Sequence, residues 1–112
     1  MKRKIAIPLA GGKLCPHFGH CETFALWTIE DGKITNREFL SPPDHQPGSF
    51  PRFLASHGAT DIIAGGLGIK AQELFRHFGI QVCVGAGSDD PDELVERYVK
   101  GELTSGLNLC DH

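Results

Sequence analysis

Residues 61–84, DIIAGGLGIKAQELFRHFGIQVCV, carry the clearest signal of the fold class. Residues 61–64 and 81–84 are short apolar runs of the kind found in buried strands. The segment between them carries apolar residues at helical spacing. A strand, a helix and a second strand in this order predict two parallel strands joined by a right-handed crossover. The sequence therefore indicates an α/β fold.

Upstream of this unit, the sequence has the pattern of antiparallel strands. Residues 4–9 alternate between apolar and other side chains and predict a first strand. Residues 24–30 and 33–40 are two further strand candidates, joined by Asp31 and Gly32, the pair that a tight two-residue hairpin turn prefers. Together with the parallel unit, these strands predict a mixed five-stranded sheet whose first, fourth and fifth strands run parallel.

Two further segments predict helices, which brings the expected number of helices to three. Residues 50–57 have helical spacing, with Ser49 as the expected cap. The last helix has the clearest start signal in the chain, because Asp90 is a good N-cap and Pro91 suits the first helical position. Gly101 is the expected end of this helix.

Length and composition predict one domain over residues 1–112, with residues 102–112 as a C-terminal tail. An apolar fraction of 40% and a charged fraction of 22% are ordinary for a folded globular protein. Eleven basic residues against fourteen acidic ones leave no basic face, so no nucleic-acid partner is expected. No segment approaches the roughly 18 apolar residues of a membrane span, so we expect a cytoplasmic protein without a membrane partner.

Histidines and cysteines cluster at two places in the chain. Four of the ten lie in residues 15–21, CPHFGHC, and two lie in residues 110–112, CDH. Thiolate and imidazole are the ligands that suit zinc, copper and iron–sulfur sites. In a reducing compartment, disulfides are not expected, and the four cysteines are better weighed as core residues, metal ligands or reactive thiols. The spacing matches no zinc-finger pattern, so the clustering predicts a metal without specifying which one.

The candidate ligands differ in how well they are presented. His45 lies in residues 42–48, PPDHQPG, a loop stiffened by prolines that presents a side chain with little entropy to lose. Simpler roles stay open for Cys21, as a small residue at the start of a strand, and for His112, as a solvated residue. Cys83 is expected to be an inert buried thiol. The preferred ligands are Cys21, His45, Cys110 and His112, with Cys15 and His17 as reserves.

A glycine-rich loop follows the strand at residues 61–64. Gly66 and Gly68 fit the letters of a dinucleotide fingerprint, but Gly85 stands where the usual acidic residue is expected, so a nucleotide is disfavoured. Glycines nevertheless let a ligand approach the backbone closely, and the exposed amides at a helix start attract an anion. An anionic metal cluster fits this description.

The motifs also support a family resemblance over nearly the whole chain. His-Phe-Gly at residues 17–19, Gly-Gly-Leu-Gly at residues 65–68 and the closing helix with Gly101 together resemble the dinitrogenase iron–molybdenum cofactor biosynthesis family. The resemblance implies a ribonuclease H-like three-layer fold and a protein that binds or carries iron–sulfur or iron–molybdenum clusters without being an enzyme. It assigns the cluster-binding surface to the loop with His17 and Gly19 and to the loop with Gly65, Gly66 and Gly68.

Three functional hypotheses follow. The first is a metal-cluster carrier or assembly scaffold, whose partners are the cluster and its donor and acceptor proteins; a homodimer is possible. The second is a protein with a single zinc or iron ion whose role is structural and which ties the C-terminal tail down. In either case the tail is expected to fold back, so that Cys110 and His112 approach Cys21 and His45. The third is thiol redox chemistry at Cys15 and Cys21, which is disfavoured because no C-x-x-C motif starts a helix here.

Overall fold

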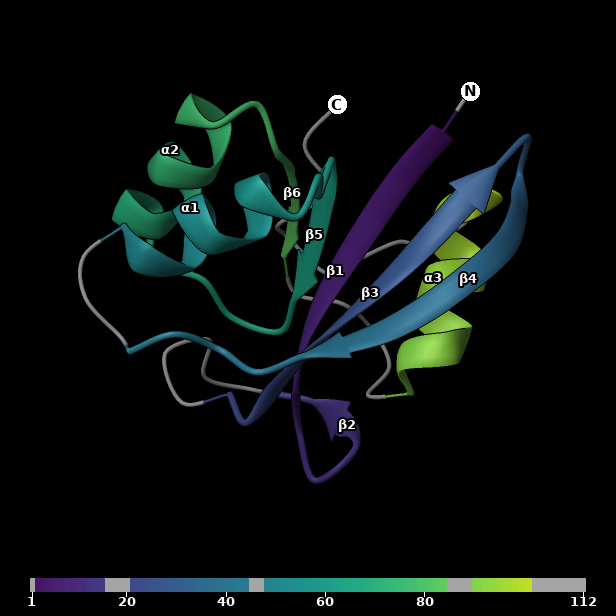
Figure 1. Ribbon diagram of the computed structural model, residues 1–112, viewed down its shortest axis with the longest axis horizontal. Coiled ribbons are helices and arrows are strands. Elements are labelled where there is room, and N and C mark those ends of the chain that lie inside the picture. Colours follow the sequence, from purple (N-terminus) through teal and green to yellow (C-terminus); the bar gives the residue numbers. More distant parts are fainter. Residues whose placement is uncertain (1, 16–20, 45–47, 85–89, 102–112) are drawn as a thin grey trace.

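A mixed sheet with helices on both faces forms the protein (Figure 1). The computed structural model describes residues 2–15, 21–44, 48–84 and 90–101. None of the helices in these ranges is long or apolar enough to cross a membrane. The strands are β1 (Lys2–Ala10), β2 (Lys13–Leu14), β3 (Thr23–Glu30), β4 (Lys33–Leu40), β5 (Asp61–Ala64) and β6 (Gln81–Val84). The helices are α1 (Ser49–Ser56), α2 (Ile69–His77) and α3 (Pro91–Val99).

The sheet has the order β4-β3-β1-β5-β6, with β2 paired to β1 outside this path. β1 is antiparallel to β3, β3 is antiparallel to β4, and β1, β5 and β6 are parallel. The predicted α/β class, mixed sheet and three helices are thus confirmed. The predicted count of five strands is wrong, because Gly11 and Gly12 take positive φ angles of 62° and 80°. They turn the chain straight back, so that β2 pairs with the end of β1. The ribonuclease H-like label stays an implication of the family resemblance.

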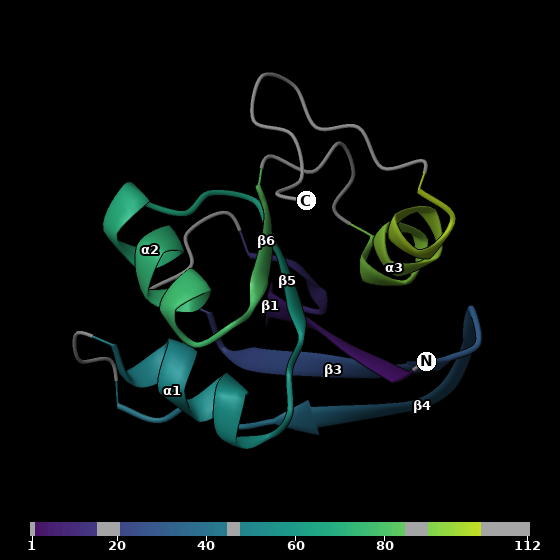
Figure 2. The same ribbon diagram turned by 90° about the horizontal axis from the view of Figure 1, so that it is seen from above.

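The helices divide between the two faces of the sheet (Figure 2). Phe50 and Leu54 of α1 and Phe75 of α2 belong to one buried apolar cluster. Leu94 and Val95 of α3 belong to a second cluster on the opposite face. Because the central strands are covered on both faces, nearly every residue of β1 from its middle to its end is buried. This arrangement has three layers.

The β3–β4 hairpin lies on one side of the sheet, with β4 as the outermost strand. Asp31 and Gly32 have φ angles of 52° and 80°, the positive values that the predicted two-residue turn requires. The register then shifts, so that Thr28 pairs with Asn36 but Ile29 pairs with Ile34, and one residue of β4 bulges between them. A bulge on an edge strand disturbs the regular ladder that another strand would need for pairing.

A buried carboxylate ties α3 to the sheet. Asp61 is 1% exposed, and its Oδ2 accepts hydrogen bonds from Arg3 Nη2 at 2.8 Å and from the Tyr98 hydroxyl at 2.7 Å. Thr60 Oγ1 donates to Asp61 Oδ1 at 2.6 Å, and the Arg3 guanidinium lies 5.1 Å from the centre of the Tyr98 ring. A buried carboxylate is tolerated when it is paired and hydrogen-bonded in this way. Asp61 begins β5, so the cluster lies at the amino end of the parallel strands.

Candidate functional site

The carboxyl ends of the parallel strands define the candidate site. Because β1, β5 and β6 run in the same direction, the loops that follow them leave the same edge of the sheet. This confirms that the cysteine-bearing loop and the glycine loop share an edge; the loop after β6 lies outside the described residues. In Figure 1 this edge is where β1 and β5 reach their lower ends. It is opposite the edge that holds Asp61.

The strands β1 and β5 separate before they reach this edge. Their ladder pairs Ile5 with Asp61 and Ala6 with Ile62, and it stops before Pro8, which has no N–H to donate. The Pro8 carbonyl instead accepts a hydrogen bond from the backbone N–H of Cys15 at 2.9 Å. The cysteine-bearing loop is therefore attached to the end of β1.

Two further hydrogen bonds close the base of this loop. The backbone N–H of Glu22 donates to the carbonyl of Leu9 at 2.8 Å, and the Glu22 carboxylate accepts from the N–H of Gly11 at 2.8 Å. Residues that flank the cysteines on both sides are thus held beside the end of β1. Sequence reasoning missed the role of Glu22, because no local spacing links it to a glycine at position 11.

Cys15 and Cys21 both lie at the base of this loop. Cys15 is 3% exposed, Cys21 is partly buried, and neither is in a disulfide. Burial, and after it the charge that Cys15 would carry as a thiolate, raise the pKa of Cys21 to about 11. Such a coupling between two thiols requires them to be near neighbours. Without a bound metal, Cys21 is a neutral thiol at pH 7 and has none of the low pKa of a redox-active cysteine.

The glycine loop leads directly into α2. Gly68 is the N-cap residue of α2, which has no side-chain cap and no acidic residue in its first turn. A side-chain Cβ built on Gly68 would meet no atom within 4 Å, so the space over this residue is open. Gln72 braces the loop from the helix, because its Nε2 donates to the Leu67 carbonyl at 2.8 Å. The position of Gln72, four residues after Gly68 and so about one helical turn on, is a signal that could have found it.

The two loops also meet in the core. Cys21 and Leu67 pack against the same buried apolar cluster, the one that α1 and α2 cover. Gly65 and Gly66 are partly buried beside Leu67. The structure therefore brings Cys15 and Cys21 and the glycine loop to one edge of the sheet. The other predicted site residues, His17, Gly19, His45, Cys110 and His112, lie outside the described residues.

The described side chains do not by themselves complete a metal centre. Within residues 2–15, 21–44, 48–84 and 90–101, no three histidine, cysteine, aspartate or glutamate side chains are grouped so that they could hold an ion. Two thiols are fewer ligands than a single zinc ion needs. The ligand set predicted from the sequence thus stays a prediction.

Cys83 lies in β6, one residue before the carboxyl end of that strand, and pairs with Ile63 of β5. It is fully buried in β6, as expected for a strand covered on both faces. The expected burial of Cys83 is thus confirmed, but the expectation of a thiol is wrong, because Cys83 is disulfide-bonded.

Comparisons with known proteins agree with one another. Residues 1–101 match the family described as dinitrogenase iron-molybdenum cofactor. The uncharacterized protein MJ0580 of Methanocaldococcus jannaschii is 35% identical over 105 residues, which cover 89% of this chain and 88% of that protein. The crystal structure of PH0822 superposes with a TM-score of 0.85 at 27% identity, covering 93% of this chain and 95% of the other. The apo form of the orange protein from Desulfovibrio gigas has the same fold, with a TM-score of 0.73 at 22% identity, covering 96% and 95% of the two chains.

Proposed function

The chain belongs to the dinitrogenase iron-molybdenum cofactor family, and from this premise we propose that it binds and carries a metal cluster of the iron–sulfur or iron–molybdenum type. In this role it hands the cluster between donor and acceptor proteins in the cytoplasm and is not itself an enzyme. The cluster is cargo, so the site has to hold it and also release it.

One observation carries the proposal. Cys15 and Cys21, neither of which is in a disulfide, lie at the same sheet edge as a glycine loop whose helix has no capping side chain. Thiolates are the common ligands of iron–sulfur clusters, and the unpaired amides of a helix start favour the negative charge that such clusters carry. The open space over Gly68 leaves room for a bulky group to approach the backbone.

The raised pKa of Cys21 supports a binding role rather than a redox one. A thiol whose pKa is about 11 is almost entirely protonated at neutral pH, so it is a poor nucleophile until a metal displaces its proton. This argues against the alternative of a thiol redox protein.

The test is loading of the apo-protein under anaerobic conditions with iron and sulfide, with and without molybdate, followed by metal analysis and a visible spectrum. We expect visible absorption from the wild-type protein and its loss in the Cys21→Ser variant. Asn36→Ala, on the exposed edge strand β4, is the control and should load like the wild type.

Two results would decide against the proposal. A colourless protein that holds a single zinc or iron ion would favour the alternative of a structural metal. Equal cluster content in wild type, Cys21→Ser and Cys15→Ala would show that the described thiols are not part of the site.

A further inference from the structure

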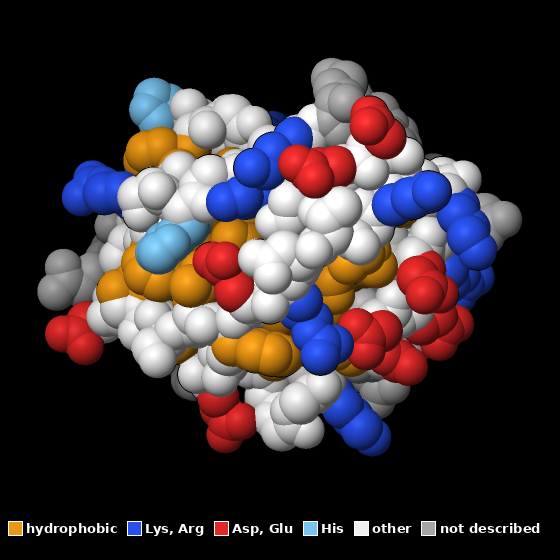
Figure 3. Space-filling view, turned by 45° about the vertical axis from the view of Figure 1, so that its right-hand side comes forward, with side chains coloured by type: hydrophobic (Ala, Val, Ile, Leu, Met, Phe, Trp, Pro, Cys, Tyr) orange, Lys and Arg blue, Asp and Glu red, His pale blue; other side chains and the backbone are white. Residues whose placement is uncertain are grey.

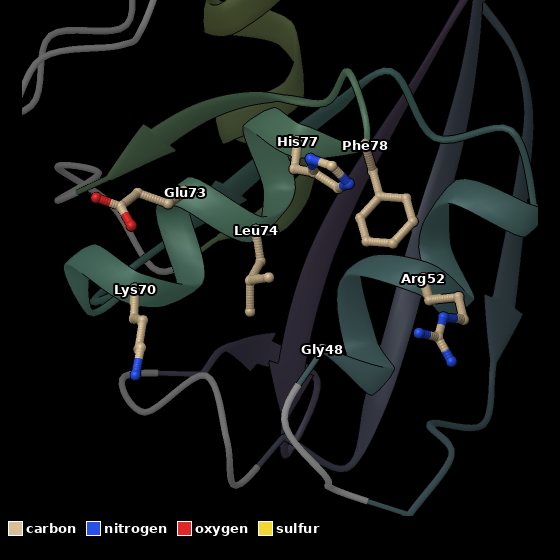
Figure 4. A pocket seen from close by; sticks show the side chains of 7 residues that line it. All are labelled: Gly48, Arg52, Lys70, Glu73, Leu74, His77 and Phe78. Carbon is tan, nitrogen blue, oxygen red and sulfur yellow. The ribbon is translucent and has the colours of Figure 1, made fainter.

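An open groove lies between α1 and α2, next to the candidate site (Figure 4). It has a volume of about 790 Å³. Its lining consists of Gly48, Arg52, Lys70, Glu73, Leu74, His77 and Phe78. The groove thus starts where both helices begin and follows α2 to its end.

The floor of the groove is apolar. Leu74 and Phe78 point from α2 toward α1, and both are only partly buried (Figure 4). Phe78 also packs on the core cluster beneath it, so the floor is fixed in place. Figure 3 shows apolar side chains reaching the surface beside histidines on the left of the view, whereas acidic and basic side chains are interspersed on the right.

The charges around this floor are mainly positive. Arg52 on α1 and Lys70 on α2 are exposed, and neither side chain has a hydrogen bond or ion pair with another described residue. Glu73 is the one carboxylate of the lining, and it points away from Arg52 (Figure 4). This differs from the chain as a whole, which has a net charge of −3.

The shape suits a protein segment better than a small molecule. Four of the seven lining residues are exposed, whereas pockets for small ligands bury most of the ligand surface. From Lys70 to His77 the helix is roughly 10 Å long, which matches about two turns of a docked helix with apolar anchors on one face.

We propose that this groove docks an acidic amphipathic segment of a partner protein. Apolar side chains of the segment lie on Leu74 and Phe78, and its carboxylates face Arg52 and Lys70. Docking here places the partner beside the glycine loop that precedes Lys70. A role for docking in cluster transfer rests on the proposed function, whereas docking itself does not.

The test uses the apo-protein, so it can fail or succeed independently of cluster binding. The probe is a peptide of about twelve residues with leucines at positions i, i+3, i+4 and i+7 and glutamates at the others. Titration into ¹⁵N-labelled protein should shift the amide signals of α1 and α2 but not those of α3, with a dissociation constant below about 1 mM. Added salt should weaken the binding.

Charge reversal in the groove identifies the site. Arg52→Glu combined with Lys70→Glu should weaken binding by about tenfold or more. Lys33→Glu combined with Lys100→Glu makes the same change in net charge at exposed positions outside the groove, and it should leave binding within about twofold. Amide spectra of both variants check that the fold is intact.

Two control peptides separate the contributions of charge and of apolar contact to binding. Replacing the glutamates by lysines, or the leucines by serines, should abolish binding. The proposal is overturned if the peptide does not bind, if both pairs of variants weaken it equally, or if acetate at about 100 mM produces the same amide shifts and displaces the peptide. The last result would show a small-anion site.

Discussion

At the scale of single residues, Cys21 offers a direct chemical test. Because burial raises the pKa of this thiol to about 11, its reaction with iodoacetamide should be slower at pH 7 than that of an unhindered thiol with a pKa of about 8.5. The rate should rise about tenfold for each pH unit toward pH 10. Mass spectrometry of the labelled peptide measures this rate. A fast, pH-independent rate at neutral pH would show an activated thiolate and favour redox chemistry.

A substitution at Gly68 tests whether this glycine serves cluster binding or the stability of the fold. Its φ of −62° is open to any residue, and a Cβ there meets nothing within 4 Å. Alanine restricts the unfolded chain, which stabilises the fold, but it suits an N-cap position less well than glycine. Because these effects oppose each other, Gly68→Ala should change the free energy of unfolding by less than about 1 kcal/mol.

If a cluster approaches this backbone, the same Gly68→Ala variant should bind it more weakly despite its intact fold. Chemical denaturation and the anaerobic loading described above measure the two effects. Unchanged loading would remove the glycine loop from the proposed site.

At the scale of elements, α3 shows how a local signal fixes a helix start. Asp90 accepts hydrogen bonds from the backbone N–H groups of Asp92 at 3.1 Å and of Glu93 at 3.5 Å, as the sequence predicted. Asp90→Ala should lower the free energy of unfolding by about 1 kcal/mol.

Asp92→Ala is the matched control for this change in α3. It removes an acidic residue from the same turn but only an exposed ion pair with Arg37, so a loss within about 0.5 kcal/mol is expected. Urea denaturation of both variants makes the comparison, and equal losses would mean that the cap contributes nothing beyond its charge.

Unlike α3, helix α1 does not begin with a side-chain cap. Ser49 was expected to cap the helix, but Gly48 is the N-cap residue and has no side chain to offer. The Ser49 hydroxyl donates instead to the carbonyl of Asp44 at 2.9 Å. The preference of serine for caps is a local tendency, and here the hydrogen bond to Asp44 takes the Ser49 hydroxyl away from the capping role.

At the scale of the whole molecule, the buried Asp61 cluster links the two halves of the chain and makes stability depend on alkaline pH. Burial and then the hydrogen bond to Asp61 raise the pKa of Tyr98 above its ordinary value of 10. The folded protein therefore keeps a proton that the unfolded chain loses above pH 10. The resulting stabilisation is complete below pH 10 and falls as the pH rises through the higher pKa of the folded state.

The Tyr98→Phe variant tests this dependence of stability on pH, by comparison of its unfolding free energy with that of the wild type. The variant loses the hydrogen bond to a charged group, so its unfolding free energy at pH 7 should fall by about 1.5–3 kcal/mol. Above pH 10 the gap to the wild type should narrow, because the wild type alone loses the contribution of the tyrosine. Urea denaturation between about pH 7 and pH 11 measures the gap; a constant gap would show that Tyr98 does not titrate with unfolding.

Features that depend on residues close together in the chain could be predicted from the amino-acid sequence. The hairpin at Asp31 and Gly32 and the start of α3 at Asp90 follow from backbone preferences of a few consecutive residues. The parallel order of β1, β5 and β6 follows from the alternation of strand and helix. The same rules placed the first loop and the glycine loop at one edge of the sheet, so the location of the candidate site was predictable before any coordinates.

Only the tertiary structure decided which groups meet across long separations in the chain. It joined Arg3, Asp61 and Tyr98, held Cys15 at the carbonyl of Pro8, and opened the groove between α1 and α2. No local pattern encodes these contacts, because each depends on the packing of whole elements. The raised pKa of Cys21 is of the same kind, since burial, rather than the neighbouring residues in sequence, is its main cause.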